Sequence, residues 1–125
     1  GDLTQEQMLS ELIYEGEINR LIKKNVLVYK QRRDFLYQCL EENFKNAVHF
    51  KKPTGGLALW LQFNTVISLV KLSEQALKYD LFLSKTILYQ DKNTCAIRLG
   101  FGHLNEEEIE IIVKKLKQAY DCVLN

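Results

Sequence analysis

The chain has 125 residues, which suits a single domain (1–125) able to bury a core of its own. Its 17 basic and 16 acidic side chains give a formal net charge of +1. This balance argues against a surface that coats nucleic acid and against an acidic, solvating tail. No apolar run reaches the roughly 20 residues that span a bilayer, and no signal-peptide pattern opens the chain.

Three cysteines, Cys39, Cys95 and Cys122, lie far apart and without metal-type spacing to either histidine. We therefore expect reduced thiols, a cytoplasmic protein and no metal site. The chain begins with Gly1 instead of Met, so we also expect an excised fragment or a processed form.

Two helices are predicted first. Thr4 and Gln7 resemble a capping box for a short amphipathic helix, which Gly16 is expected to break or cap. Apolar residues then keep near-helical spacing from Glu17 to Phe44, which predicts one long helix. Its basic side chains include Lys23, Lys24, Lys30, Arg32 and Arg33. We favour a solvated helix face over a phosphate-binding stripe, because exposed aromatic residues are not interleaved with them.

A strand at 47–52 and a strand at 57–63 are predicted to pair as an antiparallel hairpin, with the turn at Pro53–Gly56. In the second strand Leu57, Leu59, Leu61 and Phe63 would face a core, because side chains alternate along a strand. The two turn glycines could approach a ligand, but a hairpin turn is their commoner use.

A helix opening near Ser68 is predicted next, followed by a short strand at 81–84 and a loop at 86–94. The run CAIRLGF is predicted as a strand, and Asn105 as the cap of a last helix that begins with three glutamates. The order α, α, β, β, α, β, β, α predicts an α+β fold with a small, mostly antiparallel sheet of three to four strands packed against helices.

Arg98 is the strongest candidate for binding. In its strand it shares one face with Ala96, Gly100 and Gly102, so a long cation stands among very small neighbours. A solvent-exposed strand face would explain this, since arginine is common there. A rigid guanidinium with space beside it would also suit bidentate binding of a carboxylate. The pattern alone favours neither interpretation.

The other polar candidates are weaker. His49 and His103 lie far apart, and each is more often a structural group than a base or a ligand. Lys85 follows Ser84, but a two-residue match is poor support for a Schiff-base lysine. We therefore assign no catalytic residue in this chain.

Several stretches in order, GEINRLIKK, YKQRRDFLYQCL, PTGGLALWLQF and CAIRLGFGHLNEEEIE, give the chain a resemblance to a known family. It resembles the C-terminal small domain of fold-type I, pyridoxal-phosphate-dependent, class I/II aminotransferase-like proteins. The first and last stretches look most like the aminotransferase-like region of MocR-type regulators of the GntR superfamily. The resemblance runs from about Met8 to Leu124. The sequence departs from it at Asp80 and at Lys85-Thr86, where many members have Gly and Pro-Gly.

The resemblance implies that Arg98 binds the α-carboxylate of an amino-acid substrate or effector. It also implies that the Schiff-base lysine lies in a large cofactor domain outside this chain, and that any winged helix-turn-helix lies outside it too. Pyridoxal phosphate is thus expected for the full-length protein and not for this fragment, together with DNA binding through another domain and a homodimer. Three alternatives stay open: a regulator that senses an amino acid, a genuine aminotransferase, and a free-standing α+β interaction module.

Overall fold

The computed structural model describes the backbone of residues 15–51 and 58–125, and the side chains from residue 26 onward within those ranges. The chain divides into two compact parts, residues 1–31 and residues 32–125. Each is described by itself. In the first part, the described residues form the beginning of helix α2 (Glu15–Phe44). The second part holds the sheet, the other helices and the candidate site.

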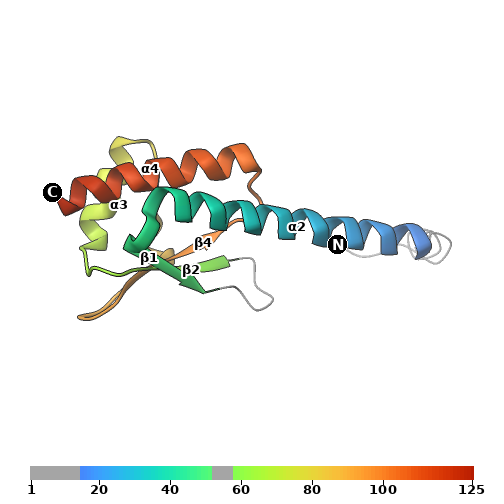
Figure 1. The fold of residues 1–125 in the computed structure, drawn as a ribbon, viewed down its shortest axis with the longest axis horizontal. Helices are drawn as coiled ribbons and strands as arrows, with labels where there is room; N and C mark the ends of the chain where they lie inside the picture. Colours follow the sequence, from blue (N-terminus) through green and yellow to red (C-terminus); the bar gives the residue numbers. More distant parts are fainter. Residues whose placement is uncertain (1–14, 52–57) are drawn as a thin grey trace. The chain divides into compact units, whose positions relative to one another are not determined.

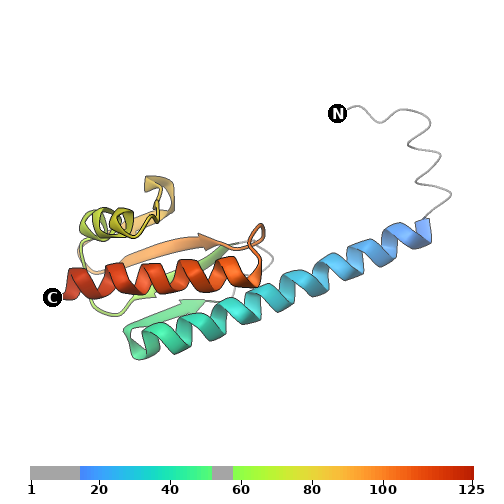
Figure 2. The same cartoon turned by 90° about the horizontal axis from the view of Figure 1, so that it is seen from above.

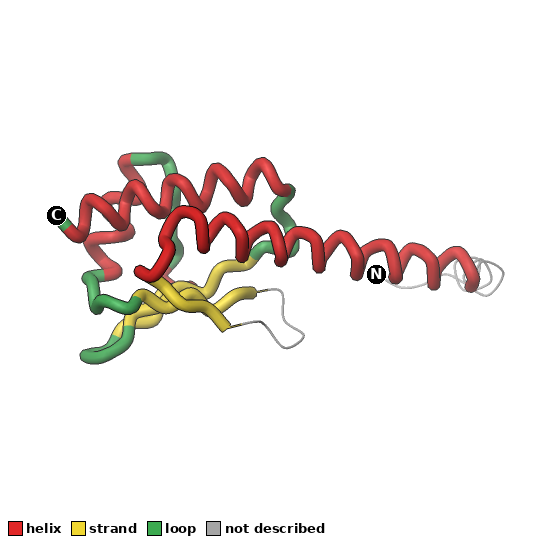
Figure 3. Tube along the Cα trace, viewed as in Figure 1, coloured by secondary structure: helices red, strands yellow, loops and turns green. Residues whose placement is uncertain are grey.

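Four strands form one antiparallel sheet (Figures 1 and 3). They are β1 (Val48–Lys51), β2 (Ala58–Phe63), β3 (Leu88–Gln90) and β4 (Cys95–Gly100). Their order in the sheet is β1-β2-β4-β3, so β2 and β4 are the two central strands. The predicted α+β class with a small antiparallel sheet is confirmed.

The helices of this part lie on one face of the sheet, as the view from above shows (Figure 2). They are α3 (Leu69–Lys78), α4 (Glu106–Leu124) and the end of α2 from Arg32 to Phe44. The apolar side of the sheet faces them, and alternate β2 residues are buried as predicted. The most deeply buried large side chains are Leu40, Leu59, Leu61, Leu69, Leu72, Ile97, Phe101, Ile109 and Leu116.

Three aromatic rings join α2, β2 and α4 at one end of this core. The Tyr120 ring stacks on that of Phe63 with 5.2 Å between centroids, and it meets Phe44 edge-on at 5.5 Å. Such pairs add to the free energy gained by burying their surface. Burial also raises the pKa of the Tyr120 phenol.

Two predictions about the first helices need comment. The short helix predicted before Gly16 falls on residues outside the described ones. The break or cap predicted at Gly16 is wrong, because Gly16 is the second residue of α2. The first backbone amides of a helix have no hydrogen-bond partner within that helix, so a glycine at its second position does not interrupt the helical hydrogen bonds.

The third strand does not lie where it was predicted. Residues 81–84 have no strand structure, and β3 lies in the segment predicted as a loop. Leu88, Tyr89 and Gln90 pair with Ile97, Ala96 and Cys95 across a tight turn. The carboxylate of Asp91 holds this turn by accepting from the amides of Asn93 and Thr94, each at 2.8 Å. A short apolar run such as LFL signals burial without specifying a strand.

Asp80 ends α3 in the left-handed conformation, with φ of 61°. Its amide donates to the carbonyl of Leu77 at 3.0 Å, and the amide of Leu81 donates to the carbonyl of Ala76 at 2.9 Å. This is the hydrogen bonding of a helix terminus that normally selects glycine. The departure from the family pattern at Asp80 therefore keeps the backbone conformation that glycine favours.

Candidate ligand-binding face of the sheet

The face of the sheet opposite the helices is formed by alternate residues of all four strands. The pairing places Lys51, Trp60 and Arg98 in one row across β1, β2 and β4. A second row contains His49, Gln62, Ala96 and Tyr89. None of the helices within residues 32–125 covers this face (Figure 1).

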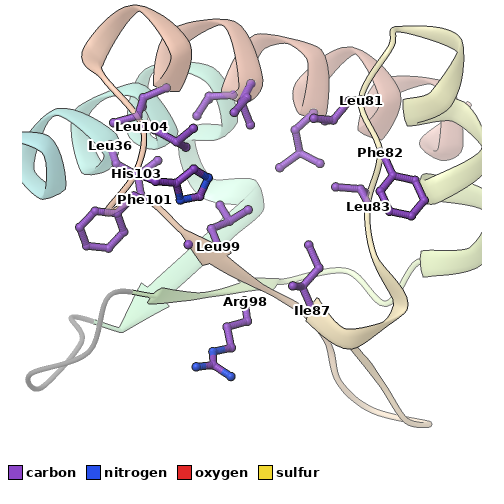
Figure 4. A pocket seen from close by; sticks show the side chains of 15 residues that line it. Leu36, Leu81, Phe82, Leu83, Ile87, Arg98, Leu99, Phe101, His103 and Leu104 are labelled. Carbon is purple, nitrogen blue, oxygen red and sulfur yellow. The ribbon is translucent and has the colours of Figure 1, made fainter. Parts of the chain in front are cut away.

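Arg98 projects from β4 on this open face, on the other side of the strand from Leu99 (Figure 4). The side chain is exposed, while Ile97 before it is fully buried. Within residues 26–51 and 58–125, no carboxylate pairs with its guanidinium and no acceptor bonds to it. The strand therefore presents a cation whose donors are unused within the described structure.

A hollow of about 360 Å³ lies beside Arg98. Its other lining residues are Ala58, Gly100, Thr86 and Ile87. Ala58 and Gly100 are opposite each other on β2 and β4, so the two central strands leave space at this level of the sheet. Nothing lies within 4 Å of the position that a Cβ on Gly100 would take. Of the small neighbours predicted from the sequence, Gly100 thus borders the hollow, whereas Ala96 and Gly102 are not among its lining residues.

An aromatic pair lies on the same face of the sheet as Arg98. Trp60 is its direct partner on β2, and the ring of Trp60 lies 5.3 Å from that of Tyr89. The indole Nε1 of Trp60 donates to Gln62 Oε1 at 3.2 Å, and the Tyr89 hydroxyl donates to Asp91 Oδ2 at 3.2 Å. These hydrogen bonds fix the two rings in place.

Thr86, Ile87 and Tyr89 belong to this face, and sequence reasoning did not place them there. They lie in the segment predicted as a loop, so their register against β4 was not predicted. The sequence carried no clear signal for this placement, because a strand of three residues is too short for an alternating pattern.

The two histidines lie in different surroundings. His49 Nδ1 is hydrogen-bonded to Asn64 Oδ1 at 2.5 Å, and Asn64 Nδ2 donates to the Asn46 carbonyl at 2.6 Å. His103 lines a largely apolar cavity of about 320 Å³ on the helix side of the sheet. Arg98 also borders this cavity, but its guanidinium points away from His103, to the other side of the strand (Figure 4). No group of three or more metal-binding side chains occurs in the part of the chain that is described.

Two of the basic residues on α2 have structural contacts. The Arg32 guanidinium donates to the Gly102 carbonyl at 3.2 Å, which anchors the loop that follows β4. Arg33 pairs with Asp34 at 3.3 Å and lies over the Tyr37 ring.

None of the described helices is long and apolar enough to cross a membrane. All three cysteines are free thiols.

The described residues do not fit pyridoxal phosphate by themselves. A Schiff-base lysine is activated by a desolvated pocket or a neighbouring cation. Lys85, the lysine that borders a groove, is exposed at the start of the short 3-10 helix η2 (Lys85–Ile87). The hydroxyl groups beside it, on Ser84 and Thr86, are hydrogen-bonded to each other at 2.9 Å.

Comparison with known proteins gives relatives of two kinds. The chain is 26% identical over 117 residues to the HTH-type transcriptional regulator NorG of Staphylococcus aureus, covering 93% of this chain and 26% of NorG. It is 30% identical over 110 residues to an uncharacterised aminotransferase of Saccharolobus solfataricus, covering 85% of this chain and 27% of that protein. No family model matches the chain.

The fold occurs in a solved aminotransferase. LysN, an α-aminoadipate aminotransferase of Thermus thermophilus crystallised with N-(5'-phosphopyridoxyl)-L-leucine, matches with a TM-score of 0.71 and 20% identity. The match covers 94% of this chain and 31% of that one. The predicted resemblance to the small domain of aminotransferase-like proteins is therefore confirmed. The chain spans about a quarter of the length of its curated relatives.

Proposed function

We propose that Arg98 binds the carboxylate of an amino-acid ligand at the open face of the sheet. The observation that carries this proposal is an exposed guanidinium with no partner in the described structure, on a central strand, beside a hollow of about 360 Å³. A guanidinium offers two parallel donors to a carboxylate, so a rigid strand and empty space suit such a ligand.

For the full-length protein we propose a transcriptional regulator of the GntR/MocR type that senses an amino acid through pyridoxal phosphate. The similarity to the regulator NorG over nearly the whole chain supports this class. The cofactor and the DNA would be bound by domains outside this chain, and the protein would be a cytoplasmic homodimer. Free thiols at all three cysteines suit a reducing compartment.

A second candidate is the small domain of a genuine aminotransferase. It is favoured by the 30% identity to the aminotransferase of Saccharolobus solfataricus. Arg98 would hold the substrate carboxylate in the same way, and the reacting groups would again lie outside this chain. A winged helix-turn-helix in the full-length protein, or its absence, distinguishes the two candidates.

Calorimetry on the full-length protein tests the role of Arg98. The protein, saturated with pyridoxal phosphate, is first screened for a thermal shift with each of the twenty L-amino acids. The best one is then titrated into wild type, Arg98→Ala and Arg98→Lys. We expect Arg98→Ala to weaken binding by about 30-fold or more, which corresponds to about 2 kcal/mol. Arg98→Lys should recover only part, since lysine keeps the charge but lacks the fork.

The matched control is Lys51→Ala, which removes an exposed cation two strands away in the same row. It should leave the affinity within about twofold, because exposed charges at this distance are screened. Unchanged affinity in Arg98→Ala would defeat the assignment. A turnover assay with the same amino acid and a 2-oxoacid then separates an enzyme from a sensor.

A further inference from the structure

The hollow beside Arg98 has two larger bordering residues to which the proposed function gives no role. Ala58 and Gly100, which also line it, carry almost no side chain. Apart from Arg98 itself, the larger lining side chains are those of Thr86 and Ile87. The size of a ligand that fits beside the guanidinium therefore depends on these two residues.

The hollow has more room than a carboxylate needs. A closed cavity of about 150 Å³ holds a molecule of the size of benzene. The hollow measures about 360 Å³. An amino acid held by its carboxylate on Arg98 would therefore place neighbouring atoms in the hollow as well. Those atoms would lie against the residues that line it.

Thr86 and Ile87 differ in their surroundings. Ile87 is half-buried, and it also borders the cavity of about 320 Å³ on the helix side of the sheet. Thr86 is exposed, and it lies at one of the positions where the sequence departs from the family pattern. Thr86 can therefore contact a ligand without taking part in the core.

The structure holds Thr86 at a fixed place relative to Arg98. Leu88 pairs with Ile97, the residue before Arg98, and η2 contacts β4 directly. The Thr86 amide donates to Ser84 Oγ at 3.3 Å, and a side chain branched at Cβ has few rotamers. The Thr86 hydroxyl is hydrogen-bonded to the Ser84 hydroxyl at 2.9 Å. Because this hydroxyl already has a partner, Thr86 would act on a ligand through its shape.

We infer that Thr86 limits the size of the amino acid that Arg98 binds, and that the ligand has a short, uncharged side chain. This inference rests on the proposed function, because it requires a carboxylate on the guanidinium. A short side chain fits between Arg98 and Thr86, whereas each further methylene group meets a fixed wall. Among the described residues that line the hollow, Arg98 alone is charged, so a charged ligand side chain would find no partner there.

Calorimetry on the full-length protein, saturated with pyridoxal phosphate, tests this size limit. The probes are L-alanine, L-norvaline and L-norleucine, whose side chains differ only in the number of methylene groups. We expect wild type to bind L-alanine at least about tenfold more tightly than L-norleucine. Thr86→Ala removes two heavy atoms from the wall and should lower this ratio by about tenfold, because each methylene group that gains room adds about fourfold to the affinity.

Two further variants identify the cause of the change. Thr86→Val keeps the branched shape and removes the hydroxyl, so the ratio should stay within about twofold of wild type. Thr65→Ala is the matched control, because Thr65 is an exposed threonine that does not line the hollow. It should leave the ratio unchanged. Circular dichroism confirms that each variant is folded, as expected for exposed positions.

Arg98→Ala separates this inference from the proposed function. Binding of L-alanine that does not depend on Arg98 would overturn both. Binding that depends on Arg98, with a ratio unchanged in Thr86→Ala, would overturn the size limit alone. The size limit is also overturned if Thr86→Val lowers the ratio as much as Thr86→Ala, or if wild type shows no preference for L-alanine over L-norleucine.

Discussion

Trp60 and Arg98 lie directly opposite each other on the two central strands, on the sheet face that no helix within residues 32–125 covers. The indole is held by a hydrogen bond to Gln62 and by the ring of Tyr89, whereas the guanidinium has no partner among the described residues. A cation held for the fold would be expected to have such a partner. Trp60 is therefore a supporting residue, whereas Arg98 is available to a ligand.

The first prediction concerns the stability of the isolated chain. Because Arg98 is exposed and unpaired within the described structure, Arg98→Ala should change the free energy of unfolding by no more than about 0.5 kcal/mol. Leu61→Ala, at a fully buried position on the neighbouring strand, should cost about 2–5 kcal/mol. Urea unfolding followed by circular dichroism measures both. A loss above about 1.5 kcal/mol for Arg98→Ala would indicate a structural role.

The second prediction concerns pH and the β3–β4 turn. Hydrogen bonds from the Asn93 and Thr94 amides hold the pKa of Asp91 below its usual value. A carboxyl group whose pKa is lowered by folding stabilises the folded state above its unfolded pKa of about 3.9, and this stabilisation is lost as the pH falls through the folded pKa. Asp91→Asn should therefore be less stable than wild type at pH 7, and the difference should shrink toward pH 2.

Urea midpoints at pH 7, 5, 3 and 2 test this expectation. Glu41→Gln, which removes an exposed carboxylate on α2, serves as the control. An Asp91→Asn difference that stays constant across this range would show that the carboxylate charge does not stabilise the turn. The side-chain carboxyl resonance of Asp91, followed by NMR, gives the folded pKa directly.

The third prediction concerns the end of α3. Asp80 has a φ of 61°, a conformation that glycine adopts freely and that β-branched residues adopt with strain. Asp80→Gly should be at least as stable as wild type, and Asp80→Val should lose about 1–2 kcal/mol. Thermal and urea unfolding of the three proteins give the order. A stable valine variant would mean that the chain ends α3 without a left-handed residue.

The fourth prediction concerns the start of α4. The Asn105 side chain accepts from the Glu108 amide at 2.8 Å, and the Glu108 carboxylate accepts from the Asn105 amide at 3.1 Å. Asn105→Ala should cost about 1 kcal/mol, as for other caps of this kind. Glu107→Ala, in the same turn but outside this pair, should cost less. Equal losses of stability in the two variants would show that the capping pair adds nothing beyond the negative charge of the first helical turn.

Elements with strong periodicity were predictable. Alternation in β2 and β4 identified the central strands, and the capping residues Ser68 and Asn105 marked the starts of α3 and α4. Both signals are local, because side-chain direction and cap hydrogen bonds depend on a few neighbouring residues. The resemblance to the small domain of aminotransferase-like proteins came from the same stretches.

The strand β3 was not predictable in the same way, because long-range contacts stabilise it. The Gln90 side chain accepts from the Leu69 amide at 2.7 Å and donates to the Ile67 carbonyl at 2.6 Å, which ties β3 to the start of α3. Three residues are too few for a clear alternating pattern. The hollow beside Arg98 depends on this placement, because Thr86 and Ile87 precede β3 directly.

The unequal lengths of β3 and β4 have one more consequence. β3 begins at Leu88, opposite Ile97, whereas β4 continues to Gly100. From Arg98 onward, β4 therefore has a partner strand toward β2 and none toward β3 among the described residues. The short 3-10 helix η2 (Lys85–Ile87) contacts β4 there, in the place that a longer β3 would occupy. Because η2 replaces a paired strand at this level, its residues Thr86 and Ile87 form one wall of the hollow beside the guanidinium.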